Sequence, residues 1–133
     1  MFEKIKSHVP ILVIALFLIT IAAVPALAST SSFSNFCLPA WQGNVTVATG
    51  YKSSTGTKSA YVNVTSNKYG GIFWIDRNTN DRVTDSKSIN PGTGGSLHYY
   101  NDGAWAGYAQ LRGCQQGWGP NGCDSISGTV NFG

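Results

Sequence analysis

Charged residues are scarce in this sequence, and glutamate is almost absent. Asp, Glu, Lys and Arg make up only 11% of the 133 residues, and the single glutamate is Glu3. The few Lys and Arg residues form no cluster, so the basic footprint expected of a nucleic-acid-binding protein is missing. The only histidines are His8 and His98. Because general acid–base catalysis needs positioned titratable groups, we expect a protein that is not an enzyme. Catalysis would require His98 to meet a serine and an aspartate in a cleft.

The sequence does not favour a metal site either. The stretch DRNTNDRVTD places Asp76, Asn78 and Asn80 at the first, third and fifth positions of a calcium loop. Such a loop also needs glycine at the sixth position and a carboxylate at the twelfth, where this chain has Asp81 and Lys87. We therefore interpret the stretch as a polar hairpin loop and expect no metal ion and no cofactor.

A hydrophobic run long enough to cross a membrane is also missing. Two lysines precede an apolar run that ends in Ala-Leu-Ala at Ala28, which is the pattern of a secretory signal peptide. The uninterrupted apolar stretch between Pro10 and Pro25 is shorter than the roughly 20 residues that a bilayer requires. We therefore expect residues 1–28 to be a cleaved signal peptide. Residues 29–133 are expected to form a single secreted, extracellular β-domain without stable membrane insertion.

Three cysteines follow the predicted signal peptide, namely Cys37, Cys114 and Cys123. Export makes disulfides chemically plausible. The segment CQQGWGPNGC is rich in Gly, Pro and Asn and is able to turn back on itself, which favours a bond between Cys114 and Cys123. The alternative is a bond from Cys37 to one of these two.

Helical periodicity is missing, and short alternating runs take its place. NVTVATGY from Asn44 and SAYVNVT from Ser59 have the pattern of half-buried strands. GIFWID from Gly71 is apolar on both faces, as a covered central strand is, and SISGTVNF from Ser125 is the expected last strand. STSSFSNF from Ser29 is interpreted as a Ser/Thr-rich leader. These short strands favour an all-β fold, a small antiparallel β-sandwich, with a small β-barrel as the alternative.

The segment SLHYYNDGAWAGYAQLRG, which begins at Ser96, predicts a β-hairpin. A three-residue loop over 101–103 with Gly103 in the left-handed conformation is a common connection. The alternative is a two-residue turn at 102–103, which separates polar from apolar side chains less well. In the favoured register the core-facing residues are Leu97, Tyr99, Trp105, Ala109 and Leu111, and the solvent-facing residues are His98, Tyr100, Ala106, Tyr108, Gln110 and Arg112.

The solvent-facing side of this segment supplies most of the predicted ligand-binding residues. Tyr100 and Tyr108 present flat rings of the kind that stack on sugars, and Arg112 has the bidentate donors that bind a phosphate or carboxylate. Trp118 lies in the Gly-rich stretch between the last two cysteines, where deep burial is difficult. We predict that these four residues bind a ligand. The structural alternative is that the rings belong to the core, because aromatic side chains supply much of its buried area.

Three stretches of the chain resemble a known group of proteins. They are TKSAYVNVTSNKYGGIFWID, GTGGSLHYYNDGAWAGYAQLRG and SISGTVNFG. Their order resembles that of small secreted proteins of Gram-positive bacteria that are catalogued as a domain of unknown function and are often encoded beside bacteriocin-associated membrane and transporter proteins. GAWAGYAQL and GTKSAYVNV are also similar to lactococcin 972-like bacteriocins, which act at the cell-wall precursor lipid II.

The resemblance implies a secreted, non-enzymatic protein that acts at the bacterial cell surface and is bacteriocin-like or bacteriocin-associated. The expected partner is a component of the bacterial cell envelope or a glycan. A carbohydrate-binding or adhesive module without killing activity is the alternative function. The resemblance assigns no catalytic residues.

Overall fold

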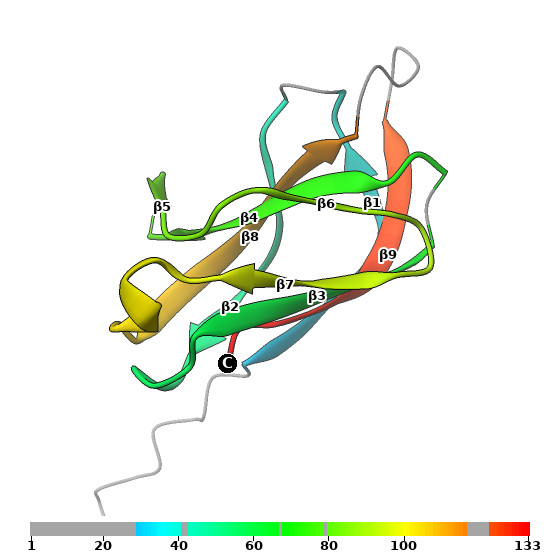
Figure 1. Ribbon diagram of the computed structural model, residues 1–133. Helices are drawn as coiled ribbons and strands as arrows, with labels where there is room; N and C mark the ends of the chain where they lie inside the picture. Colours follow the sequence, from blue (N-terminus) through cyan, green and yellow to red (C-terminus); the bar gives the residue numbers. More distant parts are fainter. Residues whose placement is uncertain (1–28, 41–42, 67, 79, 117–122) are drawn as a thin grey trace, which may run out of the picture.

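The computed structural model describes residues 29–40, 43–66, 68–78, 80–116 and 123–133. These residues form two antiparallel sheets that pack face to face, so the fold is an open β-sandwich and not a closed barrel (Figure 1). The predicted fold class is confirmed. Among the described residues, no helix is long and apolar enough to cross a membrane.

Each sheet has a simple order of strands. The four-stranded sheet runs in the order β1 (Thr30–Leu38), β9 (Asp124–Asn131), β3 (Ser59–Ser66) and β7 (Gly94–His98). The five-stranded sheet runs in the order β2 (Val45–Lys52), β8 (Gly107–Gln115), β4 (Gly71–Arg77) and β5 (Asp81–Arg82), and β6 (Lys87–Ile89) also pairs with β4. One short 3-10 helix, η1 (Tyr100–Gly103), follows β7.

The predicted alternation of β3 and the covered position of β4 are both confirmed. Val62 and Val64 of β3 are fully buried between the sheets, whereas Tyr61 is 52% exposed. In β4, Phe73 belongs to the core. Trp74 faces the other side but is buried as well, because the guanidinium of Arg82 lies 4.5 Å from its ring centroid. Both faces of this central strand are therefore covered.

The interpretation of STSSFSNF as a leader is wrong, because all of it except Ser29 belongs to β1. β1 pairs with β9 along its length, with an irregularity between Phe33 and Phe36. Asn35, within this irregularity, has a positive φ of 48°. Phe33 is buried in the core and Leu38 is fully buried. The irregularity interrupts the two-residue alternation that marks a strand in a sequence, which explains why β1 has no clear sequence signal.

The predicted hairpin between residues 96 and 113 is also wrong. β7 pairs with β3, whereas β8 pairs with β2 and β4, so the chain crosses from one sheet to the other at η1 (Figure 1). Gly103 does adopt the left-handed conformation, with φ 69°, but Asn101 and Asp102 also have positive φ. The inward and outward sides were predicted correctly, because a hairpin and a crossover both keep alternate residues facing the core.

The favoured disulfide between Cys114 and Cys123 is wrong as well, and the alternative pairing involving Cys37 is present. Cys37 and Cys123 are bonded, and their Cα atoms lie 5.0 Å apart. The strand register explains this choice, because Cys37 of β1 pairs with Ser125 of β9, so Cys37 lies beside the start of β9. Cys114 instead lies buried within β8 of the other sheet.

Candidate functional site

The crossover at η1 is held by the buried cation of Lys52. This side chain, at the end of β2, is fully buried. Its Nζ donates hydrogen bonds to the carbonyl oxygens of Gly103 at 2.9 Å and Trp105 at 2.8 Å, and to that of Ser54. Nζ also lies 5.2 Å from the ring centroid of Tyr99, where cation–π attraction is expected. The residues after η1 are therefore fixed to the five-stranded sheet.

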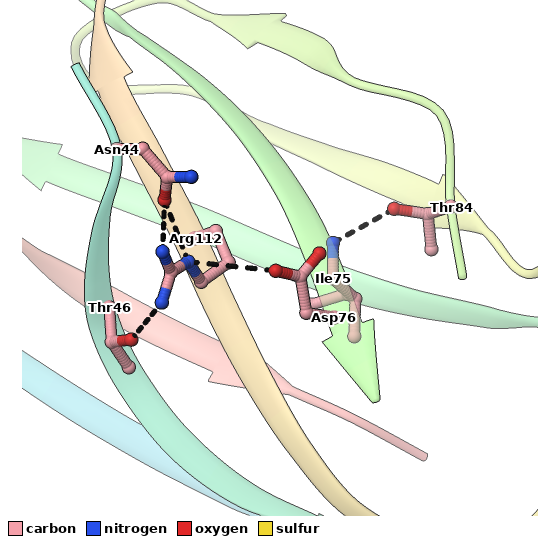
Figure 2. Close-up of polar contacts among 6 residues, drawn as sticks. All are labelled: Asn44, Thr46, Ile75, Asp76, Thr84 and Arg112. Atoms are coloured by element: carbon pink, nitrogen blue, oxygen red, sulfur yellow. Dashed lines mark hydrogen bonds and ion pairs between the residues drawn. The ribbon is translucent and has the colours of Figure 1, made fainter. Parts of the chain in front are cut away.

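A second anchor joins the crossover to the segment that follows β5. Thr84 is fully buried, and its hydroxyl oxygen accepts a hydrogen bond of 2.9 Å from the backbone N–H of Ile75 (Figure 2). The backbone of Thr84 forms an isolated bridge to Tyr99, and the N–H of Tyr100 donates to the carbonyl oxygen of Val83 at 2.8 Å. This segment therefore connects the edge of β4 with the start of η1.

The segments that these two anchors hold in place contribute residues to a pocket at one end of the sandwich. Its volume is about 240 Å³. β5 and η1 lie at the same end of the molecule in Figure 1, and both contribute side chains. The lining residues are Arg77, Asp81, Arg82, Val83, Tyr100, Asn101, Ala104 and Trp105.

The two arginines of the pocket have different partners. Arg77 forms an ion pair of 2.7 Å with Asp81 and also donates from Nε to the same carboxylate oxygen. The guanidinium carbon of Arg82 lies 4.5 Å from the ring centroid of Trp74, and no carboxylate among the described residues lies within ion-pair distance of it. Arg82 is also exposed, and a guanidinium carries five N–H donors. Arg82 therefore presents a positive charge that the fold does not neutralise by direct contact.

Tyr100 lies at the rim of the pocket and is 43% exposed. Its hydroxyl donates a hydrogen bond of 2.9 Å to Asp85. Desolvation raises the pKa of Tyr100, as do the hydrogen bond to Asp85 and the charge of this residue. The ring is therefore held in place as a neutral phenol and leaves much of its surface accessible.

The indole of Trp105 forms the inner part of the pocket wall. Its ring packs edge-on against Tyr99, with centroids 5.3 Å apart, and Arg77 lies 6.0 Å from its centroid. Its Nε1 is buried and has no hydrogen-bond acceptor among the described residues. A buried donor without a partner is unusual in native proteins and needs an explanation.

Of the three predicted ligand-binding residues that the structure describes, only Tyr100 lines this pocket. Tyr108 is 44% exposed and pairs with Tyr51 on the outer face of the five-stranded sheet. Trp118 lies outside the described residues. The pocket therefore includes one of the three described residues, whereas Tyr108 and Arg112 lie on β8 outside its lining.

Arg112 is already held by neighbouring side chains (Figure 2). Its Nε donates to Asn44 at 2.9 Å, one terminal nitrogen donates to Thr46 at 2.6 Å, and Nε lies 3.6 Å from the carboxylate of Asp76. Burial raises the pKa of Asp76, although the charges of Arg112 and Arg82 act in the opposite direction. A ligand would have to displace these partners to reach Arg112, so its binding role remains a prediction.

His98 does meet a serine, but on an open strand surface. Its Nδ1 lies 2.7 Å from the hydroxyl oxygen of Ser59, and His98 is exposed. Within the part of the chain that the structure describes, no carboxylate is bonded to His98, and no group of three or more His, Cys, Asp or Glu side chains could hold a metal ion. Among the described residues, the pair therefore has no carboxylate as the third group that orients the base of an activated nucleophile.

Sequence reasoning missed the arginines of the pocket and its tryptophan. Arg77 and Arg82 were assigned only to a polar hairpin loop, which is confirmed by the pairing of β4 with β5 and by the positive φ of Asn78 and Asn80. Trp105 was assigned to the core. The local sequence contains no signal that this loop meets the crossover, because that contact depends on the pairing of distant strands.

No protein-family model, no curated protein and no solved structure matches this chain. The fold defines it as a small antiparallel β-sandwich with a pocket at one end.

Proposed function

We propose that this protein is secreted and acts without catalysis at the bacterial cell surface, as a bacteriocin-like or bacteriocin-associated binding protein. The observation that carries the proposal is the pocket beside η1, which combines aromatic surface, hydrogen-bond donors and the accessible cation of Arg82. The predicted signal peptide of residues 1–28 and the disulfide between Cys37 and Cys123 support an extracellular location. The resemblance to bacteriocin-associated proteins supports the bacterial target.

The construction of the pocket favours binding. The segment at η1 turns tightly, because Asn101 and Asp102 both have positive φ, and the Lys52 and Thr84 anchors hold the neighbouring segments. A site that is ordered before the ligand arrives avoids much of the entropy cost of ordering loops. With about 240 Å³, it is smaller than the roughly 300–1,000 Å³ of sites for drug-sized ligands. It therefore suits one small group or one sugar ring.

The second candidate function is a carbohydrate-binding or adhesive module without killing activity. It is supported by the outer face of the four-stranded sheet, where Tyr61 is 52% exposed. Tyr61 pairs with Ser96 on one side and with Asn131 on the other, and Asn63 lies two residues along the same strand. A flat ring among hydroxyl and amide groups is a plausible surface for neutral glycans.

The test is depletion of the purified protein from solution by washed Gram-positive cells and by isolated cell walls. We expect saturable depletion by both, and about tenfold weaker binding for Tyr100→Ala, which corresponds to the roughly 1.4 kcal/mol expected from loss of a stacking contact. Tyr100→Phe retains the ring and should bind almost normally. Tyr69→Ala is the matched control, because Tyr69 is 37% exposed and lies in the turn before β4, away from the pocket.

Absence of depletion by cells and by walls would overturn the proposed envelope binding. Equal depletion by wild type and Tyr100→Ala would reject this pocket, and a selective loss with Tyr61→Ala would favour the outer face of the four-stranded sheet. A killing assay with the same cells separates the two functions, because only the bacteriocin-like protein inhibits growth.

A further inference from the structure

We propose that the pocket beside η1 recognises the negatively charged group of an acidic sugar, a carboxylate or a phosphate carried on a pyranose ring. This inference rests on the proposed function and specifies the ligand class of the same site.

One charged donor in the lining has no carboxylate partner. It is the guanidinium of Arg82, which forms no ion pair among the described residues. The one carboxylate in the lining, Asp81, already accepts both contacts from Arg77. A ligand that complements this guanidinium must supply acceptor oxygens, and carboxylates and phosphates supply several in one small group.

Arg82 is the residue best placed to bind the anion. Its guanidinium carbon lies 4.5 Å from the ring centroid of Trp74, and the residue is exposed and lines the pocket. The ion pair with Asp81 occupies Arg77 and leaves Arg82 as the charge that a ligand would neutralise. Planar guanidinium groups bind carboxylate and phosphate through two parallel hydrogen bonds.

The remaining lining explains why the anion should be carried by a sugar. Tyr100 presents an exposed ring at the rim, on which the apolar face of a pyranose can stack. Asn101 follows directly in η1 and lines the same pocket, where its amide is available for sugar hydroxyls. The cavity of about 240 Å³ has room for one ring and not for a longer ligand within its walls. The outer part of a polysaccharide would continue into solvent.

The test compares three probes that share the same ring. D-glucuronate carries a carboxylate, glucose 6-phosphate carries a phosphate, and glucose carries neither. Binding to the full protein is followed by amide chemical-shift titration, which detects millimolar affinity. We expect at least one acidic probe to bind about tenfold more tightly than glucose and to shift the amides of η1 and β5. Binding of only one acidic probe would identify its group.

The variant Arg82→Gln should remove the preference for acidic probes while leaving any binding of glucose unchanged. Lys68→Gln is the matched control, because Lys68 also lies over a ring, 5.2 Å from that of Tyr69, but not in this pocket. Since Arg82 is exposed, we expect Arg82→Gln to stay folded, which amide dispersion checks directly. Tyr100→Ala offers a second route, as it should weaken all three probes.

Three results would overturn the inference. The first is equal binding of glucose and both acidic probes, and the second is no binding of any probe. The third is a preference for acidic probes that persists in Arg82→Gln. These results are distinct from failure of the proposed function, because depletion by cells and walls is measured separately. A protein that binds cells through Tyr100 without a preference for acidic probes would retain the proposed function and lose this ligand class.

Discussion

At the scale of single residues, Lys52 shows how a buried charge can organise this fold. Removing an ammonium group from water is costly unless hydrogen bonds replace its hydration. Here three carbonyl oxygens and the faces of Tyr99 and Trp105 surround Nζ. Desolvation still lowers the pKa of Lys52. The cation satisfies carbonyl groups at the crossover that would otherwise be buried without donors.

We expect Lys52→Met to loosen the crossover. The substitution keeps a long side chain but leaves the carbonyl oxygens of Gly103 and Trp105 without their donor, which should reduce the free energy of unfolding by about 2–4 kcal/mol. Urea unfolding measures this loss, and hydrogen exchange should accelerate at residues 103–105. Lys58→Met is the control, since Lys58 is exposed. Equal stability of the Lys52→Met protein and the wild type would refute the role of Lys52 as an anchor.

At the scale of elements, the disulfide joins the end of β1 to the start of β9. The bonded residues are separated by 86 positions, so the bond encloses nearly all of the described domain. In the chain-entropy account, a loop of this length removes far more freedom from the unfolded chain than the short ring between Cys114 and Cys123 would. The bond therefore stabilises the closure of the four-stranded sheet at its edge.

We expect reduction of this bond, or the variant Cys37→Ser, to lower the free energy of unfolding by up to about 4–5 kcal/mol. Chemical denaturation with and without reductant measures the effect. Chymotrypsin cleavage after Trp118 separates Cys114 from Cys123, so mass spectrometry of the fragments establishes the pairing. A linked pair containing Cys114, or no change in stability for Cys37→Ser, would contradict the structure.

Comparison of individual elements shows which features of the fold are local. β3 and β4 were predicted because alternation at Val62 and Val64 and the two apolar faces around Phe73 are properties of single strands. The strands that pair with β8 were not predicted, because a hairpin and a crossover place Leu97 and Leu111 in the core equally well. The same limit applies to the site. Tyr100 was identified as exposed, whereas its position beside Arg82 depends on contacts between distant elements.

At the scale of the whole molecule, the sandwich has two outer surfaces with different chemistry. Ser59, His98 and Tyr61 lie on the outer side of the four-stranded sheet. The outer side of the five-stranded sheet instead carries an ion pair between Arg112 and Asp76 (Figure 2). The pocket lies where the second sheet meets the crossover. Because different residues form the two outer surfaces, substitutions can test each surface on its own.

Stability of the whole domain should depend on pH in a way that reveals the buried carboxyl group of Asp76. Burial raises its pKa above the ordinary value of 3.8. The folded protein therefore binds a proton at this site in a range of pH where the unfolded chain has released it. By linkage, the stabilisation from this proton is complete below pH 3.8 and is lost as the pH rises through the higher folded pKa.

Asp76→Asn cannot titrate, so the difference in the free energy of unfolding between wild type and variant isolates this group from the other carboxylates. We expect the wild type to lose stability relative to Asp76→Asn as the pH rises above 3.8, after which the difference should become constant. Urea unfolding of both proteins across the acidic range measures it, with Asp102→Asn as the control for loss of an exposed carboxylate. If the wild type instead gains stability relative to Asp76→Asn as the pH rises, the attraction of Arg112 outweighs burial. Asp76 and Arg112 would then stabilise the sheet as an ion pair.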